Sequence, residues 1–308
     1  MRAAFASMAE FRARFDVAAE DGARLPVYEA GGGAAAPALL VGHANGLAAG
    51  SYEPWLHDLA AHFHVFAYDA RGHGGSTWPD GLPETVFAVE RFTADLAAVA
   101  AALVSRLGGA PLHFAGHSLA AAAAIGLALG RGASPFASQT LFEPPVFPPV
   151  DAPNYPEAIA QQTRLVRGSA RRQARWASPE AMRDYLAIRG VFRSFRPEFL
   201  AAHCRATLRP DGDAFTLCCP PEVESTVFMG HRDADTWRHL PGIRAPLHLV
   251  SGDPDLPERD WVSGNMAALA ARIPGAALTV LPGAGHMMIC QQPERCRDLV
   301  LGRVAEGV

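Results

Sequence analysis

Short apolar runs alternate along the chain with longer segments whose apolar residues recur at helical spacing. A short apolar run bounded by glycine, proline or polar residues predicts a strand, and the longer pattern predicts a helix. The predicted strands are Arg14–Ala18, Leu25–Ala30, Ala38–Val41, Val65–Tyr68, Leu112–Ala115, Gln139–Phe142, Leu247–Val250 and Leu278–Leu281. The predicted helices are Tyr52–Ala61, Arg91–Leu107, Leu119–Leu129, Ser263–Ile273 and Pro293–Ala305.

Strands that alternate with helices in this way are joined by right-handed crossovers. This predicts an α/β fold, with a mostly parallel sheet covered by helices on both faces. The strands beginning at Leu112 and Leu247 are almost wholly apolar, as is typical of buried central strands.

The alternation stops between Pro144 and about Arg238. Several prolines open this stretch, and helical patterns follow at Tyr155–Trp176, Pro179–Ile188 and Pro197–Cys204. Its arginines, among them Arg171, Arg172 and Arg175, are expected on a solvated helix face. An insertion of this kind beside a parallel sheet is most simply a helical cap. The predicted domains are a core of residues 1–144 and 239–308 and a cap of residues 145–238.

Composition narrows the possible chemistry. Apolar residues make up 49% of the 308 positions and charged residues 19%, which favours a packed core over disorder. All 27 basic residues are arginine. The lack of lysine excludes a Walker-type phosphate loop, a pyridoxal Schiff base and a lysine-based aldolase mechanism. A net charge of −4 gives no electrostatic reason to expect a nucleic-acid partner.

The sequence predicts a cytoplasmic protein without membrane insertion. The segment Met1–Phe15 has charged residues among its apolar ones, so we interpret it as no signal peptide. The longest apolar stretch, Leu119–Leu129, is too short to span a bilayer. Five cysteines without a spaced framework fit reduced thiols.

A candidate nucleophile lies between a predicted buried strand and a helix of small residues. The strand Leu112–Ala115 runs into Gly116-His117-Ser118, which places Ser118 at the apex of a sharp strand-to-helix turn. Such a turn strains the backbone and lifts the hydroxyl above the sheet. A base follows the last predicted strand, because the glycines of Gly283-Ala284-Gly285 deliver His286 at the strand's carboxyl end.

The base needs a carboxylate to orient it. The strand Leu247–Val250 leads into Asp253 and Asp255, and we favour Asp255 because of its offset after Gly252. Asp253 precedes a proline and is more typical of a turn residue. Glu143, which follows the strand Gln139–Phe142, is a third candidate.

The developing oxyanion of an acyl-transfer reaction needs preorganised donors. We expect the backbone N–H of Leu119, at the start of a helix, and that of Asn45, in the loop after Ala38–Val41. The chain order Ser118, Asp255, His286 is that of nucleophile-elbow hydrolases.

Five pieces of the sequence resemble the α/β-hydrolase superfamily in their order and spacing. They are His43-Ala44-Asn45-Gly46, Asp69-Ala70-Arg71-Gly72-His73-Gly74-Gly75-Ser76, Gly116-His117-Ser118-Leu119-Ala120, Gly252-Asp253-Pro254-Asp255 and Gly285-His286. The resemblance implies an eight-stranded sheet with a lid inserted after the sixth strand.

The expected function is a serine hydrolase without a cofactor or metal, which cleaves a carboxylic ester of a small to medium apolar molecule. Thioesters, lactones and carbon–carbon bonds next to a ketone stay open, because the acyl-transfer machinery is general. The competing class is a non-catalytic small-ligand receptor on the same fold, since a fold and an intact triad do not by themselves establish turnover.

Overall fold

The computed structural model describes residues 13–306, except residues 32–35, 131–133 and 231–234. Most of the segment Met1–Phe15, on which the expectation about a signal peptide rests, therefore lies outside the described residues. Among the helices that are described, none is both long enough and apolar enough to cross a bilayer.

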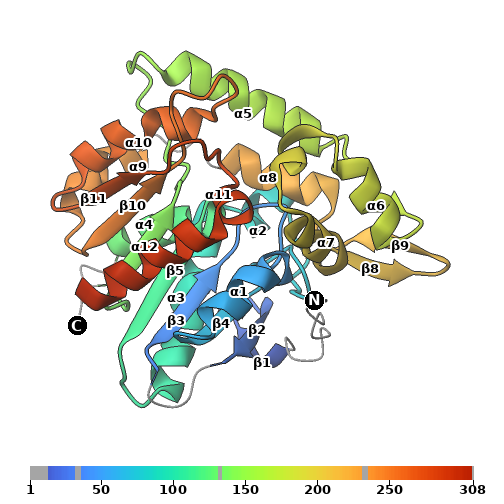
Figure 1. The fold of residues 1–308 in the computed structure, drawn as a ribbon, viewed down its shortest axis with the longest axis horizontal. Coiled ribbons are helices and arrows are strands. Elements are labelled where there is room, and N and C mark those ends of the chain that lie inside the picture. The colour runs from blue at the N-terminus through green and yellow to red at the C-terminus, as the bar shows by residue number, and fades with distance from the viewer. Residues whose placement is uncertain (1–12, 32–35, 131–133, 231–234, 307–308) are drawn as a thin grey trace, which may run out of the picture.

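An eight-stranded sheet forms the centre of the molecule, with the order β1-β2-β4-β3-β5-β6-β10-β11 (Figure 1). The strands are β1 (Ala13–Ala18), β2 (Arg24–Ala30), β3 (Ala38–Gly42), β4 (His64–Tyr68), β5 (Leu112–His117), β6 (Gln139–Phe142), β10 (Leu247–Ser251) and β11 (Ala277–Val280). β2 pairs antiparallel with β1 and β4, and the remaining neighbours are parallel. The predicted α/β fold and all eight predicted strands are confirmed, with small shifts at their ends.

Helices cover both faces of the sheet, and each face has its own apolar core. The helices that flank the sheet are α1 (Glu53–Leu59), α3 (Val89–Arg106), α4 (Leu119–Gly130), α10 (Trp261–Arg272) and α12 (Pro293–Glu306). Along β3, Leu40 belongs to the core with α3, α4 and α10, whereas Leu39 and Val41 belong to the core with α1 and α12. This alternation follows from the two-residue period of a strand. Two short helices, α2 (Pro83–Val86) and α11 (Met288–Gln291), lie in connecting segments.

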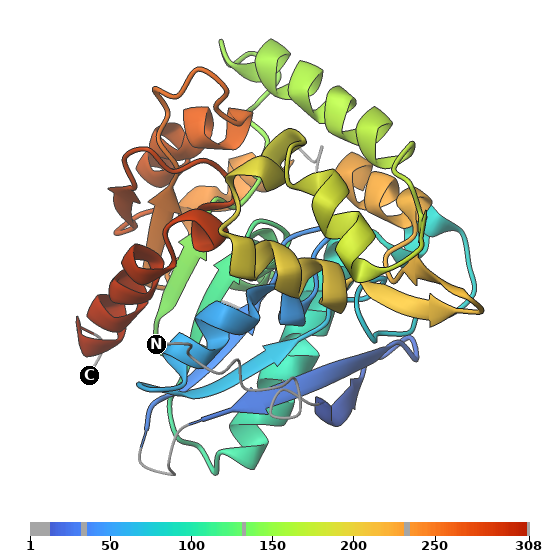
Figure 2. The same cartoon turned by 45° about the vertical axis from the view of Figure 1, so that its right-hand side comes forward.

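The segment between β6 and β10 extends over the edge at which the parallel strands end (Figure 2). It contains α5 (Tyr155–Ser169), β7 (Arg175–Trp176), α6 (Pro179–Leu186), η2 (Gly190–Ser194), α7 (Pro197–Ala206), β8 (Leu208–Asp211), β9 (Ala214–Leu217), α8 (Pro221–Gly230), α9 (Asp235–His239) and η3 (Leu240–Gly242). The predicted helix Tyr155–Trp176 is too long, because it ends at Ser169 and Trp176 lies in a strand. The small antiparallel sheet β7-β9-β8 was not predicted. Its hairpin turns at Gly212, which has a φ of +64°.

Candidate active site

Ser118 lies at the turn between β5 and α4, as the sequence predicts. Its φ is +51°, a left-handed conformation that costs a non-glycine residue free energy. The backbone N–H of Ser118 donates to the carbonyl of Phe142 at 2.9 Å, which ties the turn to the neighbouring strand β6. In the described part of the chain, Glu143 is the one other non-glycine residue with a positive φ, at +45°. Both strained residues thus belong to the same site.

Strand-to-helix turns of this kind often have a second glycine two residues after the serine, and Ala120 takes that position here. The close packing around the turn shows how the alanine is accommodated. A Cβ added to Gly42 of β3 would lie 2.4 Å from the Cβ of Ala120. The methyl group of Ala120 therefore occupies space that the glycine on the next strand leaves empty.

His286 follows β11 and reaches Ser118 from the side of the last strand. Its Nε2 lies 3.0 Å from Ser118 Oγ, within hydrogen-bond distance. Its own backbone carbonyl accepts a hydrogen bond at 2.8 Å from His117 Nε2, and the Tyr52 hydroxyl donates to His117 Nδ1 at 2.5 Å. Burial lowers the pKa of His117. A neutral His117 thus anchors the loop that carries the base.

Glu143, and not Asp255, orients the imidazole. Glu143 Oε2 lies 2.6 Å from His286 Nδ1, whereas Asp255 is exposed in the loop after β10. The prediction that Asp255 contacts the base is therefore wrong. Asp253 accepts hydrogen bonds from the backbone N–H groups of Asp255 and Gly283, as a turn residue does. The reason is topological, because β6 lies between the nucleophile strand β5 and β10 in the sheet.

The carboxylate of Glu143 is completely buried and held at both oxygens. Oε1 accepts from the backbone N–H of Gly252 at 2.7 Å and from the hydroxyl of Ser263 at 2.5 Å. These two donors leave Oε2 for the histidine. The arrangement fixes both the position of the carboxylate and the tautomer of His286, with its proton on Nδ1 and Nε2 free to accept from Ser118.

A second carboxylate, that of Asp260 at the start of α10, acts on the charge of His286. Burial lowers the pKa of His286, but the hydrogen bond that it donates to Glu143 and the negative charge of Asp260 raise this pKa, and the net direction is upward. Asp260 also accepts a hydrogen bond from the backbone N–H of Val262. We did not predict any role for Asp260 from the sequence.

Removing the charge of Asp260 should move the pH dependence of catalysis. His286 acts as a base only when neutral, so activity rises with pH through its pKa. In Asp260→Asn the charge that raises this pKa is gone, and we expect the acidic limb of the kcat/KM profile to move to lower pH. Asp213→Asn, at an exposed site on the β8–β9 turn, is the control and should not move the limb. An acidic limb at unchanged or higher pH in Asp260→Asn would contradict the electrostatic assignment.

The loop after β3 lies beside Ser118 and is held by two buried histidines. His43 Nε2 accepts from the backbone N–H of Ala70 at 3.0 Å, and His73 Nε2 accepts from that of Gly46 at 3.0 Å. The side-chain amide of Asn45 donates to the carbonyl of Glu224 at 3.0 Å. No described residue accepts a hydrogen bond from the backbone N–H of Asn45 or Leu119. The structure thus leaves both predicted donors unused.

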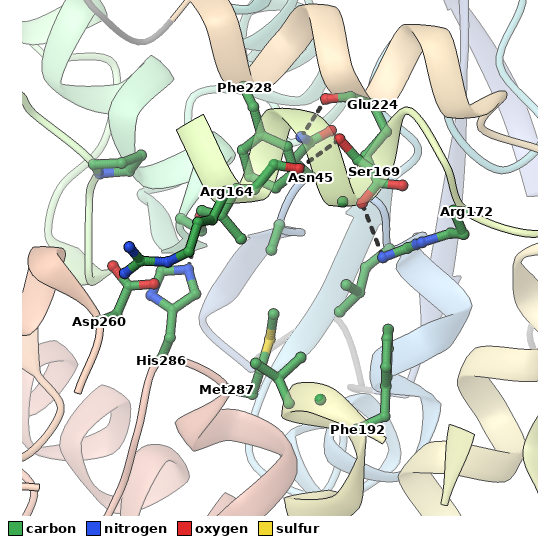
Figure 3. Close-up of a pocket in the computed structure, with 18 of the residues that line it drawn as sticks. Asn45, Arg164, Ser169, Arg172, Phe192, Glu224, Phe228, Asp260, His286 and Met287 are labelled. Carbon is green, nitrogen blue, oxygen red and sulfur yellow. Dashed lines mark hydrogen bonds and ion pairs between the residues drawn. The ribbon is translucent and has the colours of Figure 1, made fainter. Parts of the chain in front are cut away.

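A cavity of about 430 Å³ opens above Ser118 and His286 (Figure 3). Most of its wall comes from the segment between β6 and β10, including the rings of Phe192 and Phe228. Two other large aromatic side chains, those of Phe147 and Trp176, lie outside the wall of this cavity. Phe147 packs against Trp261 with ring centroids 4.4 Å apart, and Trp176 packs against Tyr185 at 5.2 Å.

Charged side chains also reach this cavity, which corrects the expectation that Arg172 faces solvent. Arg172 lines the cavity and pairs with Glu224, with Nη2 3.0 Å from Oε1. Arg164 lies near Asp260 and His286 on the other side (Figure 3). Arg164 lies on α5, Arg172 follows the end of that helix, Glu224 lies on α8, and Asp260 directly precedes α10. Because no motif connects them, no sequence pattern indicates that they share one cavity.

Comparison with known proteins places this chain in a family. The model of the Alpha/beta hydrolase family matches residues 38–299. No curated protein matches the sequence significantly.

Solved structures of similar fold include several hydrolases. The structure of E-2-(acetamidomethylene)succinate hydrolase has a TM-score of 0.75 and 22% sequence identity, covering 96% of this chain and 99% of that one. A thermophilic esterase from Thermogutta terrifontis, with malate bound, has a TM-score of 0.64 and 23% identity, covering 95% and 98%. The enol-lactonase from Burkholderia xenovorans LB400 has a TM-score of 0.67 and 22% identity, covering 94% and 100%. At these identities the similarity concerns the fold.

Proposed function

Because the chain belongs to the α/β hydrolase family, we propose that it is a serine hydrolase that cleaves a carboxylic ester through an acyl-enzyme on Ser118. The observation that supports this most is the continuous chain of hydrogen bonds from Ser118 Oγ through His286 to Glu143, at 3.0 and 2.6 Å. This is the arrangement of nucleophile, base and orienting acid that activates a hydroxyl.

In this mechanism His286 Nε2 takes the proton of Ser118 Oγ while the oxygen attacks the carbonyl carbon. Glu143 stabilises the imidazolium that forms and holds its ring in place. The tetrahedral intermediate collapses as His286 protonates the leaving alcohol. Water then attacks the acyl-enzyme with His286 as base, which releases the acid and restores Ser118.

The oxyanion of each tetrahedral intermediate accepts hydrogen bonds from the backbone N–H groups of Asn45 and Leu119. Two observations support this role. Asn45 lines the same cavity as Ser118, and Leu119 is the first residue of α4, where backbone N–H groups lack an acceptor one turn earlier. The start of a helix also favours negative charge.

Active-site titration with a fluorophosphonate probe tests this function without a guess at the substrate. An activated serine should take up one probe per chain, and peptide mapping should find it on Ser118. A chain that binds ligands without turnover and without an activated serine would stay unlabelled, which would favour the receptor alternative. Parallel assays with esters, thioesters and lactones of equal chain length then identify the preferred bond.

The segment 145–238 acts in this proposal as a cap that selects the substrate by shape, because it supplies Phe192 and Phe228 to the cavity wall. Truncation of both to alanine should enlarge the cavity and shift the preference among p-nitrophenyl esters towards longer chains. The smallest ester should lose little, because it does not fill the space that the rings occupy. The measurement is kcat/KM over a series of chain lengths.

The double variant Phe147→Ala/Trp176→Ala is the matched control, because these rings pack outside the cavity. Its chain-length preference should stay that of the wild type, although its stability falls. A uniform loss of activity over all chain lengths in the Phe192/Phe228 variant would show that the cap does not set specificity.

A further inference from the structure

Arg172 forms an ion pair with one carboxylate, and the rest of its guanidinium faces the cavity. Arg172 follows the end of α5, and its side chain is 26% exposed, whereas that of Glu224 on α8 is 3% exposed. Among the described residues, Glu224 is the sole ion-pair partner of Arg172, and no side-chain hydrogen bond of Arg172 to another acceptor is formed. The guanidinium lies 5.6 Å from the ring centroid of Phe192, another residue of the cavity wall.

The same fold shows what a fully bound guanidinium looks like. Arg71 is buried between two carboxylates, with Nε and Nη2 donating to Asp95 at 2.7 and 2.6 Å and Nη1 donating to Asp21 at 2.7 Å. Arg172 has only one carboxylate partner in the described part of the chain, Glu224, and the cavity lies where a second carboxylate could bind.

The burial of Glu224 lowers the stability of the folded state, which suggests that this carboxylate is present to position Arg172. Its side chain is almost completely buried, and its Oε2 has no hydrogen-bond partner among the described residues. A buried polar atom without a partner destabilises the folded state. The carboxylate is held next to the loop that carries Asn45, because Asn45 donates to the backbone carbonyl of Glu224. Glu224 thus holds the guanidinium near the loop that carries Asn45.

We propose that Arg172 binds a carboxylate of the substrate, so that the physiological ester carries a second, uncleaved acid group. This proposal rests on the proposed serine hydrolase function. The planar fork of a guanidinium matches a carboxylate, and such charge-assisted pairs are strong. A single negative charge fits best, since the buried carboxylate of Glu224 repels a dianion such as a phosphate monoester.

The distribution of charge also gives the substrate a direction. Asp260 and His286 lie on one side of the cavity and Arg172 on the opposite side (Figure 3). Arg164 lies beside Asp260, so their opposite charges offset each other next to His286. Arg172 attracts a carboxylate to the opposite side, which leaves the ester group over Ser118. The substrate class is therefore a monoester of a dicarboxylic acid, or another ester with a carboxylate at some distance from the scissile bond.

The test compares monomethyl esters of dicarboxylic acids, from succinate to suberate, with the matched esters in which a carboxamide replaces the free acid. Acid and amide have nearly the same size, so the ratio of their kcat/KM values isolates the charge. For the wild-type protein we expect the acid to be preferred about 10-fold to 100-fold at the best chain length. The best length measures the distance from Ser118 to Arg172.

Variants then assign the preference to Arg172. Arg172→Gln alone leaves Glu224 buried without a counter-charge, so the main variant is Arg172→Gln/Glu224→Gln, which removes both charges together. Its ratio of acid to amide should fall close to one. The single variant Arg172→Lys keeps the positive charge without the planar guanidinium, so it should keep part of the preference for the acid. Arg167→Gln, at an exposed arginine on α5, is the matched control and should keep the wild-type ratio.

The outcomes separate this proposal from the proposed function. Probe labelling of wild-type Ser118 with equal hydrolysis of acid and amide at every length would overturn the Arg172 subsite and leave the serine hydrolase intact. A preference that persists in the double variant, or that Arg167→Gln removes as well, would also overturn it. Absence of labelling and of hydrolysis would instead contradict the proposed function.

Discussion

Replacing Ser118 with alanine is expected to remove fluorophosphonate labelling and to lower kcat by roughly five to six powers of ten. The proposed mechanism needs the Oγ atom for the covalent intermediate, and among the described residues no other hydroxyl forms a hydrogen bond with His286 Nε2. Residual turnover would come from the oxyanion donors and substrate binding alone.

The folded state of this variant should stay close to that of the wild type. The strained backbone of Ser118 is set by the turn between β5 and α4, and alanine keeps the same Cβ. Thermal unfolding checks this point. Ser178→Ala, which removes the cap of α6 away from the cavity, is the control for loss of a serine: it should cost stability and leave labelling unchanged. Labelling of the Ser118→Ala protein at the wild-type rate would identify another nucleophile.

Glu143→Gln should lower kcat by about three to four powers of ten, much more than Asp255→Asn. The amide nitrogen of glutamine would face His286 Nδ1 as a donor, while its oxygen still accepts from Gly252 and Ser263. The imidazole would then carry its proton on Nε2 and lose the ability to accept the proton of Ser118. We expect the loss mainly in kcat, measured with one ester for both variants.

Asp255→Asn changes an exposed side chain away from the histidine and should keep activity within a few-fold of the wild type. Glu143→Asp is a second probe, since it keeps the charge and withdraws it from the ring, so its loss should lie between those of the other two. A larger loss from Asp255→Asn than from Glu143→Gln would show that the orienting acid is not the one that contacts His286 in this structure.

The sheet was predictable because its strands are bounded by turn residues and are apolar as a result of their burial. β5, β6 and β10 are recognisable as strands from their apolar composition, because helices cover them on both faces and every position is buried. The sheet β7-β9-β8 escaped prediction because its strands are short and half exposed. In addition, the pairing of β7 with β9 joins segments that are far apart in the chain.

The positions of the proposed nucleophile and the proposed base were predictable from the sequence itself. Each lies in a short motif whose local backbone needs particular residues, a strained turn at Ser118 and a glycine-rich loop before His286. The orienting acid was decided only by the tertiary structure. Glu143, Asp253 and Asp255 all follow parallel strands that end at the same edge, and only the order of those strands puts Glu143 next to the imidazole.

Tertiary structure alone also decided the character of the cavity. Arg172 and Glu224 are separated by more than one helix and a hairpin in the sequence, and nothing near either residue indicates the other. Their ion pair exists because α5 and α8 pack side by side over the sheet. Local motifs record what the backbone must do, whereas the charges that face a substrate depend on which distant segments the fold brings together.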